Sequence, residues 1–277
     1  MRSRNIFIWG LLAPFFFFLL FFRVIPIVGT FLELVDMNSL AGTYEIFLRG
    51  LRDLLFWTSL RNTFTIFCFI LIIKIPLAVG LSLILSKVPK GLRKVSLSIL
   101  YIPSVIGSFA YAIFFRYLFT FNGVVNTLVH TWLGFQIPWF DSSLAAQIML
   151  SLTMIWSSLG IATLFFLNGM LKIPQDYYDV LAVNGGKLRH EVFWIVLPNL
   201  KPQIKTIIFY TILESLLIVD LPMNLTQGGP DNSSLTIGYY IFKQAFQFGD
   251  FSYASVLGLF LMILVLFLLG VRKLAKF

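Results

Sequence analysis

The sequence predicts an all-α membrane protein with six transmembrane helices and both termini in the cytoplasm. Hydrophobic residues make up 58% of the 277 residues and charged residues only 12%, about half the charged fraction of a soluble domain. Six apolar segments reach the roughly 20 residues that a helix needs to cross a bilayer. Lysine and arginine gather in alternate connections, which is the pattern of cytoplasmic loops.

The six expected spans form a single transmembrane domain over residues 1–277. They cover residues 6–29, 62–85, 97–119, 144–170, 204–223 and 253–271. The first apolar segment follows Arg2 and Arg4, as the apolar part of a signal peptide does. It is too long for a signal peptide, however, and no small-residue cleavage site follows it. We therefore expect it to remain as a span.

Basic residues predict the orientation of these spans. Most lie before span 1, in the second and fourth connections, and after span 6: Arg2, Arg4, Lys87, Lys90, Arg93, Lys94, Lys172, Lys187, Arg189, Lys201, Lys205, Arg272, Lys273 and Lys276. These segments are therefore expected in the cytoplasm. The net charge of +9 follows from this topology, so no nucleic-acid partner is expected. One cysteine and two distant histidines do not predict a metal site.

The connection between spans 4 and 5, residues 172–202, is the longest polar segment expected on the cytoplasmic side. Pro174 and nearby acids favour a helix start. Gly185 and the glycine after it favour a helix stop and a tight turn. A second helical piece follows and is limited by Pro198 and Pro202. An amphipathic connector resting on lipid headgroups explains this pattern as well as a docking element does.

Three ionisable residues fall within the expected spans, where such groups are costly and face protein or a water-filled path. Lys74 lies midway along span 2. Glu214 lies nine residues after Lys205 in span 5, about 13 Å into the membrane at the rise of a helix. Asp220 is about 240° further around the same helix, so at most one of these two acids should line a common path, and Glu214 is favoured. A Lys74–Glu214 pair that stabilises the bundle is the alternative, and Tyr111 is expected at a similar depth.

Residues 172–202 resemble the cytoplasmic signature of permease subunits of binding-protein-dependent ABC importers. The resemblance rests on Ile173-Pro174, on the thirteen residues that separate Gly185 from Pro198, and on the Ile-Val-Leu-Pro sequence ending at Pro198. Asp179 stands where the family has glutamate, and Val-Leu replaces its Ala-Ala. A second segment, residues 225–260, is similar to the sugar-type branch, the maltose and glycerol-phosphate permease group. Asn62-Thr63 also matches the family.

This resemblance implies roles for three groups of residues. Residues 172–202 would carry a coupling helix that docks on ATPase subunits through Tyr177, Tyr178, Asp179, Leu181, Asn184, Gly185, Ile195 and Pro198. The substrate pathway would involve Glu214, Tyr111, Asp220 and Lys74. The outer loop, residues 224–250, would contact a binding protein through Gln227, Gly228, Gly229, Pro230 and Asp231. An ordinary hydrophilic turn is the alternative explanation of that last group.

The resemblance also implies half of the translocation pathway of an ATP-driven sugar importer in a bacterial-type plasma membrane. The expected partners are a second homologous permease in a heterodimer, two ATPase subunits and an extracellular binding protein. No GxxxxGK[ST] loop is present, so this chain is expected to be no enzyme and to hold no cofactor, with ATP and Mg in the ATPase subunits. The alternatives are a self-sufficient secondary carrier or channel, an ABC permease for a non-sugar solute, and a membrane scaffold without transport.

Overall fold

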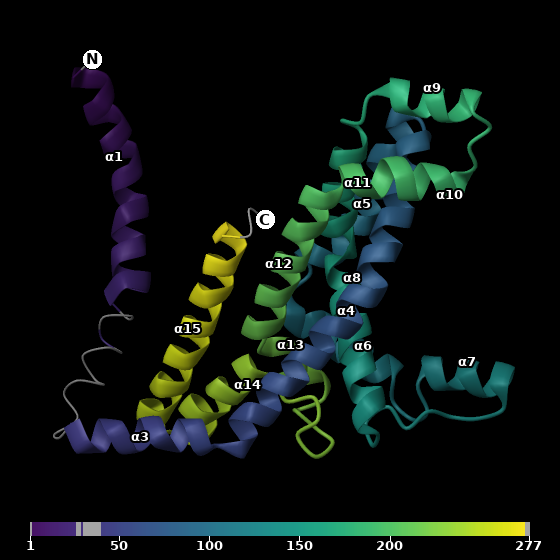
Figure 1. Cartoon of the computed structure of the whole chain (residues 1–277). Coiled ribbons are helices and arrows are strands. Elements are labelled where there is room, and N and C mark those ends of the chain that lie inside the picture. The colour runs from purple at the N-terminus through teal and green to yellow at the C-terminus, as the bar shows by residue number, and fades with distance from the viewer. Residues whose placement is uncertain (1, 26–28, 30–39, 275–277) are drawn as a thin grey trace. The chain divides into compact units, whose positions relative to one another are not determined.

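The computed structural model describes residues 2–25, 29 and 40–274, and no strand occurs within them (Figure 1). The all-helical prediction is confirmed for this part of the chain. The chain divides into two compact units. One comprises Met1–Asp53 and Ile241–Ile263, and the other comprises Leu54–Tyr240 and Leu264–Phe277.

The first unit contains helices α1 (Arg2–Leu19) and α3 (Leu40–Arg52), the π-helical turns η1 (Leu20–Val24) and η3 (Lys243–Gln247), and the first part of α15 (Phe251–Leu274). Part of expected span 1 lies outside the described residues. An ionic and aromatic cluster joins α3 to the start of α15. The Arg49 guanidinium lies 2.9 Å from the Asp250 carboxylate and 4.0 Å from the centre of the Tyr253 ring. The Tyr253 hydroxyl donates a hydrogen bond to Asp53.

The second unit contains the remaining helices: α4 (Leu54–Lys87), α5 (Lys90–Val105), α6 (Ser108–Leu118), α7 (Val124–Leu133), α8 (Ser143–Met170), α9 (Gln175–Val183), α10 (Leu188–His190), η2 (Glu191–Val196), α11 (Leu197–Asn199), α12 (Lys201–Leu217), α13 (Asp220–Leu225) and most of α14 (Ile237–Phe242). Helices α4 and α8 pack along each other at its centre (Figure 1). Within the described residues, α4, α8 and Phe251–Lys273 are long and apolar enough to cross a membrane, and α5 with α6 makes a fourth crossing if the bent pair counts as one span.

Small residues allow the helices of this core to approach closely. Gly160 of α8 faces the backbone of α5, and a Cβ atom at this position would overlap the carbonyl oxygen of Leu100. Serine and threonine side chains on the same helix are buried and return hydrogen bonds to backbone carbonyls, as in Thr163 to Leu159 at 2.8 Å. Such packing of small residues is typical of helices within membranes.

We expect Gly160→Leu to reduce the amount of folded protein in membranes, because α5 and α8 must separate to admit the side chain. Overpacking of a well-packed core costs about 1–3 kcal/mol or more, and a clash with backbone leaves little room for relaxation. Gly80→Leu on α4 is the matched control, since open space surrounds that glycine. Detergent-extracted protein would be compared by size-exclusion chromatography and thermal melting. Equal melting temperatures for the two variants would contradict this packing.

The third expected span, residues 97–119, is interrupted and does not form one continuous helix. Helices α5 and α6 meet at an angle of 95°. The break comes from Ile106 and Gly107, whose ψ angles of 133° and 137° are extended rather than helical. Apolar composition predicts immersion in the membrane, but it does not determine the backbone angles of two residues.

The fifth expected span, residues 204–223, is also interrupted. Helix α12 ends at Leu217, Ile218 is extended with a ψ of 129°, and α13 begins at Asp220. The hydroxyl of Thr236 donates a hydrogen bond of 3.0 Å to the Ile218 carbonyl, which replaces helical bonding at the break. Because the predicted angular separation of Glu214 and Asp220 assumed a continuous helix, that argument is wrong.

Candidate functional site

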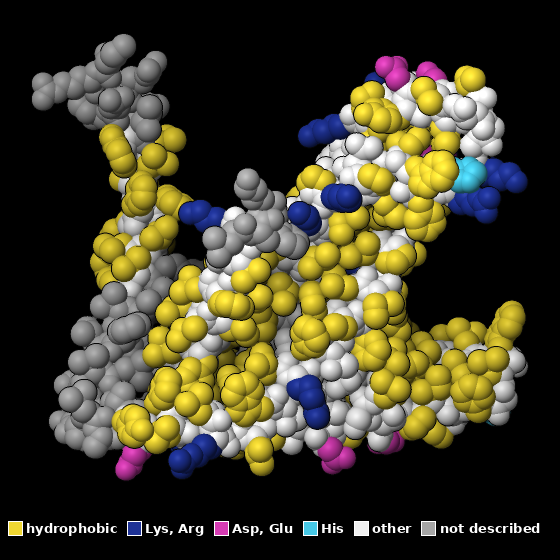
Figure 2. All heavy atoms as spheres, in the orientation of Figure 1, with side chains coloured by type: hydrophobic (Ala, Val, Ile, Leu, Met, Phe, Trp, Pro, Cys, Tyr) yellow, Lys and Arg dark blue, Asp and Glu magenta, His cyan; other side chains and the backbone are white. Residues whose placement is uncertain are grey.

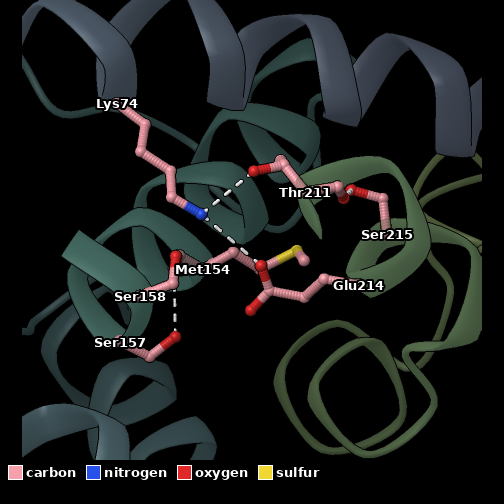
Figure 3. Close-up of polar contacts among 7 residues, drawn as sticks. All are labelled: Lys74, Met154, Ser157, Ser158, Thr211, Glu214 and Ser215. Carbon is pink, nitrogen blue, oxygen red and sulfur yellow. Dashed lines mark hydrogen bonds and ion pairs between the residues drawn. The ribbon is translucent and has the colours of Figure 1, made fainter. Parts of the chain in front are cut away.

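A buried ion pair joins α4 to α12 in the second unit (Figure 3). Lys74 of α4 is fully buried, and its Nζ lies 3.5 Å from Oε2 of Glu214 on α12. The same ammonium donates a hydrogen bond of 3.2 Å to the Thr211 hydroxyl. The Lys74–Glu214 pair, which the sequence suggested as an alternative to a role in the pathway, is therefore present. An unpaired ammonium in this place would be strongly unfavourable, so each charge stabilises the other.

Glu214 also lines an open pocket of about 240 Å³. Its side chain keeps 22% exposure, against 1% for that of Lys74, so the carboxylate forms the boundary between the buried lysine and the pocket. Most other polar groups of the wall are hydroxyls, from Ser104, Ser108, Tyr111, Ser157, Ser158 and Tyr210. The interruption between α5 and α6 contributes part of this wall. Hydroxyl groups and one paired carboxylate can exchange hydrogen bonds with a polar, uncharged ligand.

The four expected pathway residues separate into two groups. Glu214 and Tyr111 meet in the pocket, where the Tyr111 ring packs edge-on against Trp156 with the ring centres 5.9 Å apart. Lys74 lies behind Glu214. Asp220 does not line the pocket; it is exposed at the start of α13 and accepts a hydrogen bond of 2.8 Å from Ser108.

Several pocket residues were missed by sequence reasoning. Tyr210 lies four residues before Glu214 on α12, so helical spacing places both on one face and could have identified it. The serines had no comparable signal. Ser158, for example, donates a hydrogen bond of 2.7 Å to the Met154 carbonyl, as serines commonly do in the middle of a membrane helix.

The segment after α8 forms a short helix, a glycine turn and a second helical piece, as the sequence predicts. Helix α9 ends where the Asn184 side-chain amide donates a hydrogen bond of 2.7 Å to the Val180 carbonyl. Gly185 then takes a φ of +67°, which favours glycine. Helix α10, η2 and α11 follow, and the backbone breaks again at Leu200 before α12.

The expected coupling residues do not all face outward. Tyr177 is exposed, as is Val180, which was not expected to dock, whereas Tyr178 and Leu181 are half-buried and line a cavity of about 460 Å³ beneath α9. The expected coupling residues of α9 are therefore divided between two faces. Val183, which the prediction omitted, is the most exposed of the large hydrophobic residues of α9, at 88%.

The other expected coupling residues also differ in accessibility. Asp179 is exposed and accepts a hydrogen bond of 3.1 Å from the Gln175 amide. Pro198 is exposed as well. Ile195 is only 5% exposed, so it can support the segment from inside but offers little surface to another protein.

An ion pair braces the cavity beneath α9. Nζ of Lys87, the last residue of α4, lies 2.9 Å from Oε2 of Glu191 in η2. Burial, together with the negative charge of Glu191, raises the pKa of Tyr178, so this phenol stays protonated. The segment is thus tied directly to the end of a long membrane helix.

At the opposite end of α4, Asn62 and Thr63 hold the turn before α14. The buried Asn62 amide donates a hydrogen bond of 2.7 Å to the Asn232 carbonyl, and the Thr63 hydroxyl accepts one of 2.9 Å from the backbone N–H of Ile237. In the sequence, Asn62-Thr63 only matches the family. In the structure, these two residues anchor the turn before α14.

This turn contains the five residues expected to contact a binding protein. Gln227 and Asp231 are exposed, with φ angles of 56° and 47°. Gly228 is buried, while Gly229 and Pro230 are half-buried. Only the first two therefore project far enough to offer side chains to another molecule.

Residues 75–274 match the family model for the inner membrane component of binding-protein-dependent transport systems. The sulfoquinovosyl glycerol transport system permease protein SmoG of Agrobacterium fabrum is 34% identical over 74% of this chain and 67% of its own length. The lactose transport system permease protein LacF of Rhizobium radiobacter is 28% identical over 93% of this chain and 89% of its own.

Solved structures show the same fold. A chain from a bacterial alginate ABC transporter, in complex with an alginate pentasaccharide-bound periplasmic protein, has a TM-score of 0.81. The similarity covers 98% of this chain and 95% of that one, at 20% identity. With the extent of the family match, this confirms the resemblance drawn from the sequence. The chain belongs to the family of binding-protein-dependent transport system inner membrane components.

Proposed function

We propose that this chain forms half of the translocation pathway of an ATP-driven importer for a sugar or oligosaccharide. The observation that carries the proposal is the hydroxyl-lined pocket at Glu214. Lys74 pairs with this carboxylate from behind, so no unpaired cation faces the ligand. Relatives named for transport of lactose, arabinooligosaccharides and trehalose/maltose support the substrate class.

The proposed topology retains six spans with both termini in the cytoplasm. Helix α1 with η1 would form the first span, α4 the second and α8 the fourth. The interrupted pairs α5–α6 and α12–α13 would supply the third and fifth, and α15 the sixth. Broken helices at membrane depth are tolerated where they line a cavity, and the α5–α6 break does line the pocket.

Helix α9 would be the coupling helix, docked in a cleft of an ATPase subunit through Tyr177, Val180 and Val183. The Lys87–Glu191 pair would transmit its movement to α4. A second, homologous permease would complete the pathway in a heterodimer. An extracellular binding protein would contact Gln227 and Asp231. ATP and Mg would be bound by the two ATPase subunits, with no cofactor in this chain.

Co-purification and uptake test this proposal together. A tagged chain should isolate with a second permease and an ATPase subunit, and cells that produce the complex should accumulate a labelled neutral oligosaccharide. The panel would contain lactose, maltose, trehalose and arabinooligosaccharides, with amino acids as the non-sugar comparison. Uptake of an amino acid alone would contradict the substrate class, and a chain that always purifies by itself would contradict the assembly.

A further inference from the structure

Helix α7 is an amphipathic element that the transport account leaves without a role. Val124, Leu128 and Trp132 recur at every fourth residue and are exposed, with Trp132 at 82%. Thr127 and His130 lie on a different side of the helix and are also exposed. The helix therefore presents one apolar and one polar surface outside the core.

A buried asparagine fixes the orientation of α7. Asn126 is fully buried, and its Nδ2 donates a hydrogen bond of 3.0 Å to the Ile137 carbonyl. Its Oδ1 accepts hydrogen bonds of 3.1 Å from the Ile137 N–H and the Trp139 indole N–H. The Trp139 ring packs against Phe119 at the end of α6, with ring centres 4.9 Å apart. The exposed apolar stripe is therefore held in one direction.

The chain places α7 at one face of the membrane. It immediately precedes α8, and α9 follows α8 at the other end (Figure 1). The 28 residues of α8 span about 42 Å as a helix, enough to cross a bilayer. Helix α7 thus projects from the core at the level where α8 enters the membrane, and hydrophobic side chains gather on this projection (Figure 2).

We propose that α7 lies in the membrane interface, with Val124, Leu128 and Trp132 inserted among the lipids and with Thr127 and His130 facing water. The segment from Phe121 to Phe135 contains no Lys, Arg, Asp or Glu, so its attraction to the bilayer is the burial of apolar surface. Tryptophan is enriched at this depth. The two flanking phenylalanines are exposed and extend the apolar surface at both ends of the helix.

Lipid fits this surface better than a protein does. A protein interface carries about one hydrogen bond per 100–200 Å², whereas the side chains of the exposed stripe offer only the indole N–H of Trp132. Helix α6 likewise exposes Phe109, Ile113 and Tyr117 at the same four-residue spacing.

Site-directed labelling of the full chain tests the proposal. Cys68 is the single cysteine, so Cys68→Ala gives a background for Leu128→Cys, Trp132→Cys, Thr127→Cys and His130→Cys. Opened membrane fragments, in which both faces are accessible, would be treated with a water-soluble maleimide. A second set would carry bimane and be reconstituted with lipids brominated near the headgroup.

We expect no maleimide labelling of cysteines at positions 128 and 132. Bimane attached at these two positions should be quenched by the brominated lipid. Positions 127 and 130 should label and remain unquenched, which makes them the matched controls on the same helix. Equal labelling of both faces would place α7 in water. Protection at 128 and 132 without quenching would show that protein covers the stripe. Either result would overturn the proposal.

Discussion

Replacing Glu214 with alanine is expected to destabilise the protein by about 3–5 kcal/mol, because removal of one partner from a buried ion pair leaves the other charge uncompensated. The ammonium of Lys74 would keep only the Thr211 hydroxyl among the side chains drawn around it (Figure 3). The change would be measured as a drop in melting temperature and in the amount of extracted, monodisperse protein.

A neutral double variant separates the stabilising role of this pair from its role in the pathway. Lys74→Met with Glu214→Gln removes both charges and keeps the approximate volumes, so assembly should recover relative to Glu214→Ala. Uptake should remain impaired, because the amide presents different hydrogen-bonding groups to the pocket. Glu214→Gln alone keeps a carbonyl oxygen that can accept a hydrogen bond from the Lys74 ammonium, so it should impair uptake more than assembly. Normal uptake by a fully assembled Glu214→Gln complex would show that the carboxylate is only structural.

Val183→Asp is expected to abolish uptake by weakening the docking of α9 on its ATPase subunit. Apolar anchors at the centre of an interface commonly contribute about 2 kcal/mol or more each, and a carboxylate buried without a partner adds a further cost. Because Val183 is 88% exposed, the substitution should leave the folding of this chain unchanged. The amount of ATPase that co-purifies with the tagged chain would be measured.

Leu188→Asp is the matched control for this prediction. Leu188 is also an exposed hydrophobic residue of the same segment, but it lies beyond Gly185 on α10. It should retain ATPase binding if α9 is the docking element. Equal loss of binding in both variants would contradict a dock centred on α9, and retention in both would show that α9 is not the contact.

The fold class was predictable because long apolar segments, and a helix–glycine–helix pattern centred on Gly185, depend on local sequence. The interruptions at Ile106 and Ile218 were not predictable in the same way. The second depends on a hydrogen bond from Thr236, 18 residues away, and apolar composition on either side of each break is unchanged. Local periodicity has no information on such tertiary contacts.

The ionisable part of the candidate site was predictable because such residues are costly in their surroundings. Lys74 and Glu214 were identified because charges at membrane depth require an explanation. The serines of the pocket are ordinary in an apolar helix, and only the arrangement of α5, α6, α8 and α12 brings them together. Ile195 is the opposite case, because it was predicted from the family motif but is buried. It therefore has little surface to offer a partner.

Transport by the reconstituted complex tests whether this chain works as half of an ATP-driven importer. The chain would be placed in proteoliposomes with its co-purified permease and ATPase subunits, and uptake of a labelled oligosaccharide would be followed in the presence of the binding protein. We predict uptake that requires ATP on the ATPase side and the binding protein on the other side, and that falls sharply in the Glu214→Gln complex. Uptake by this chain alone, driven by an ion gradient without ATPase subunits, would contradict the account.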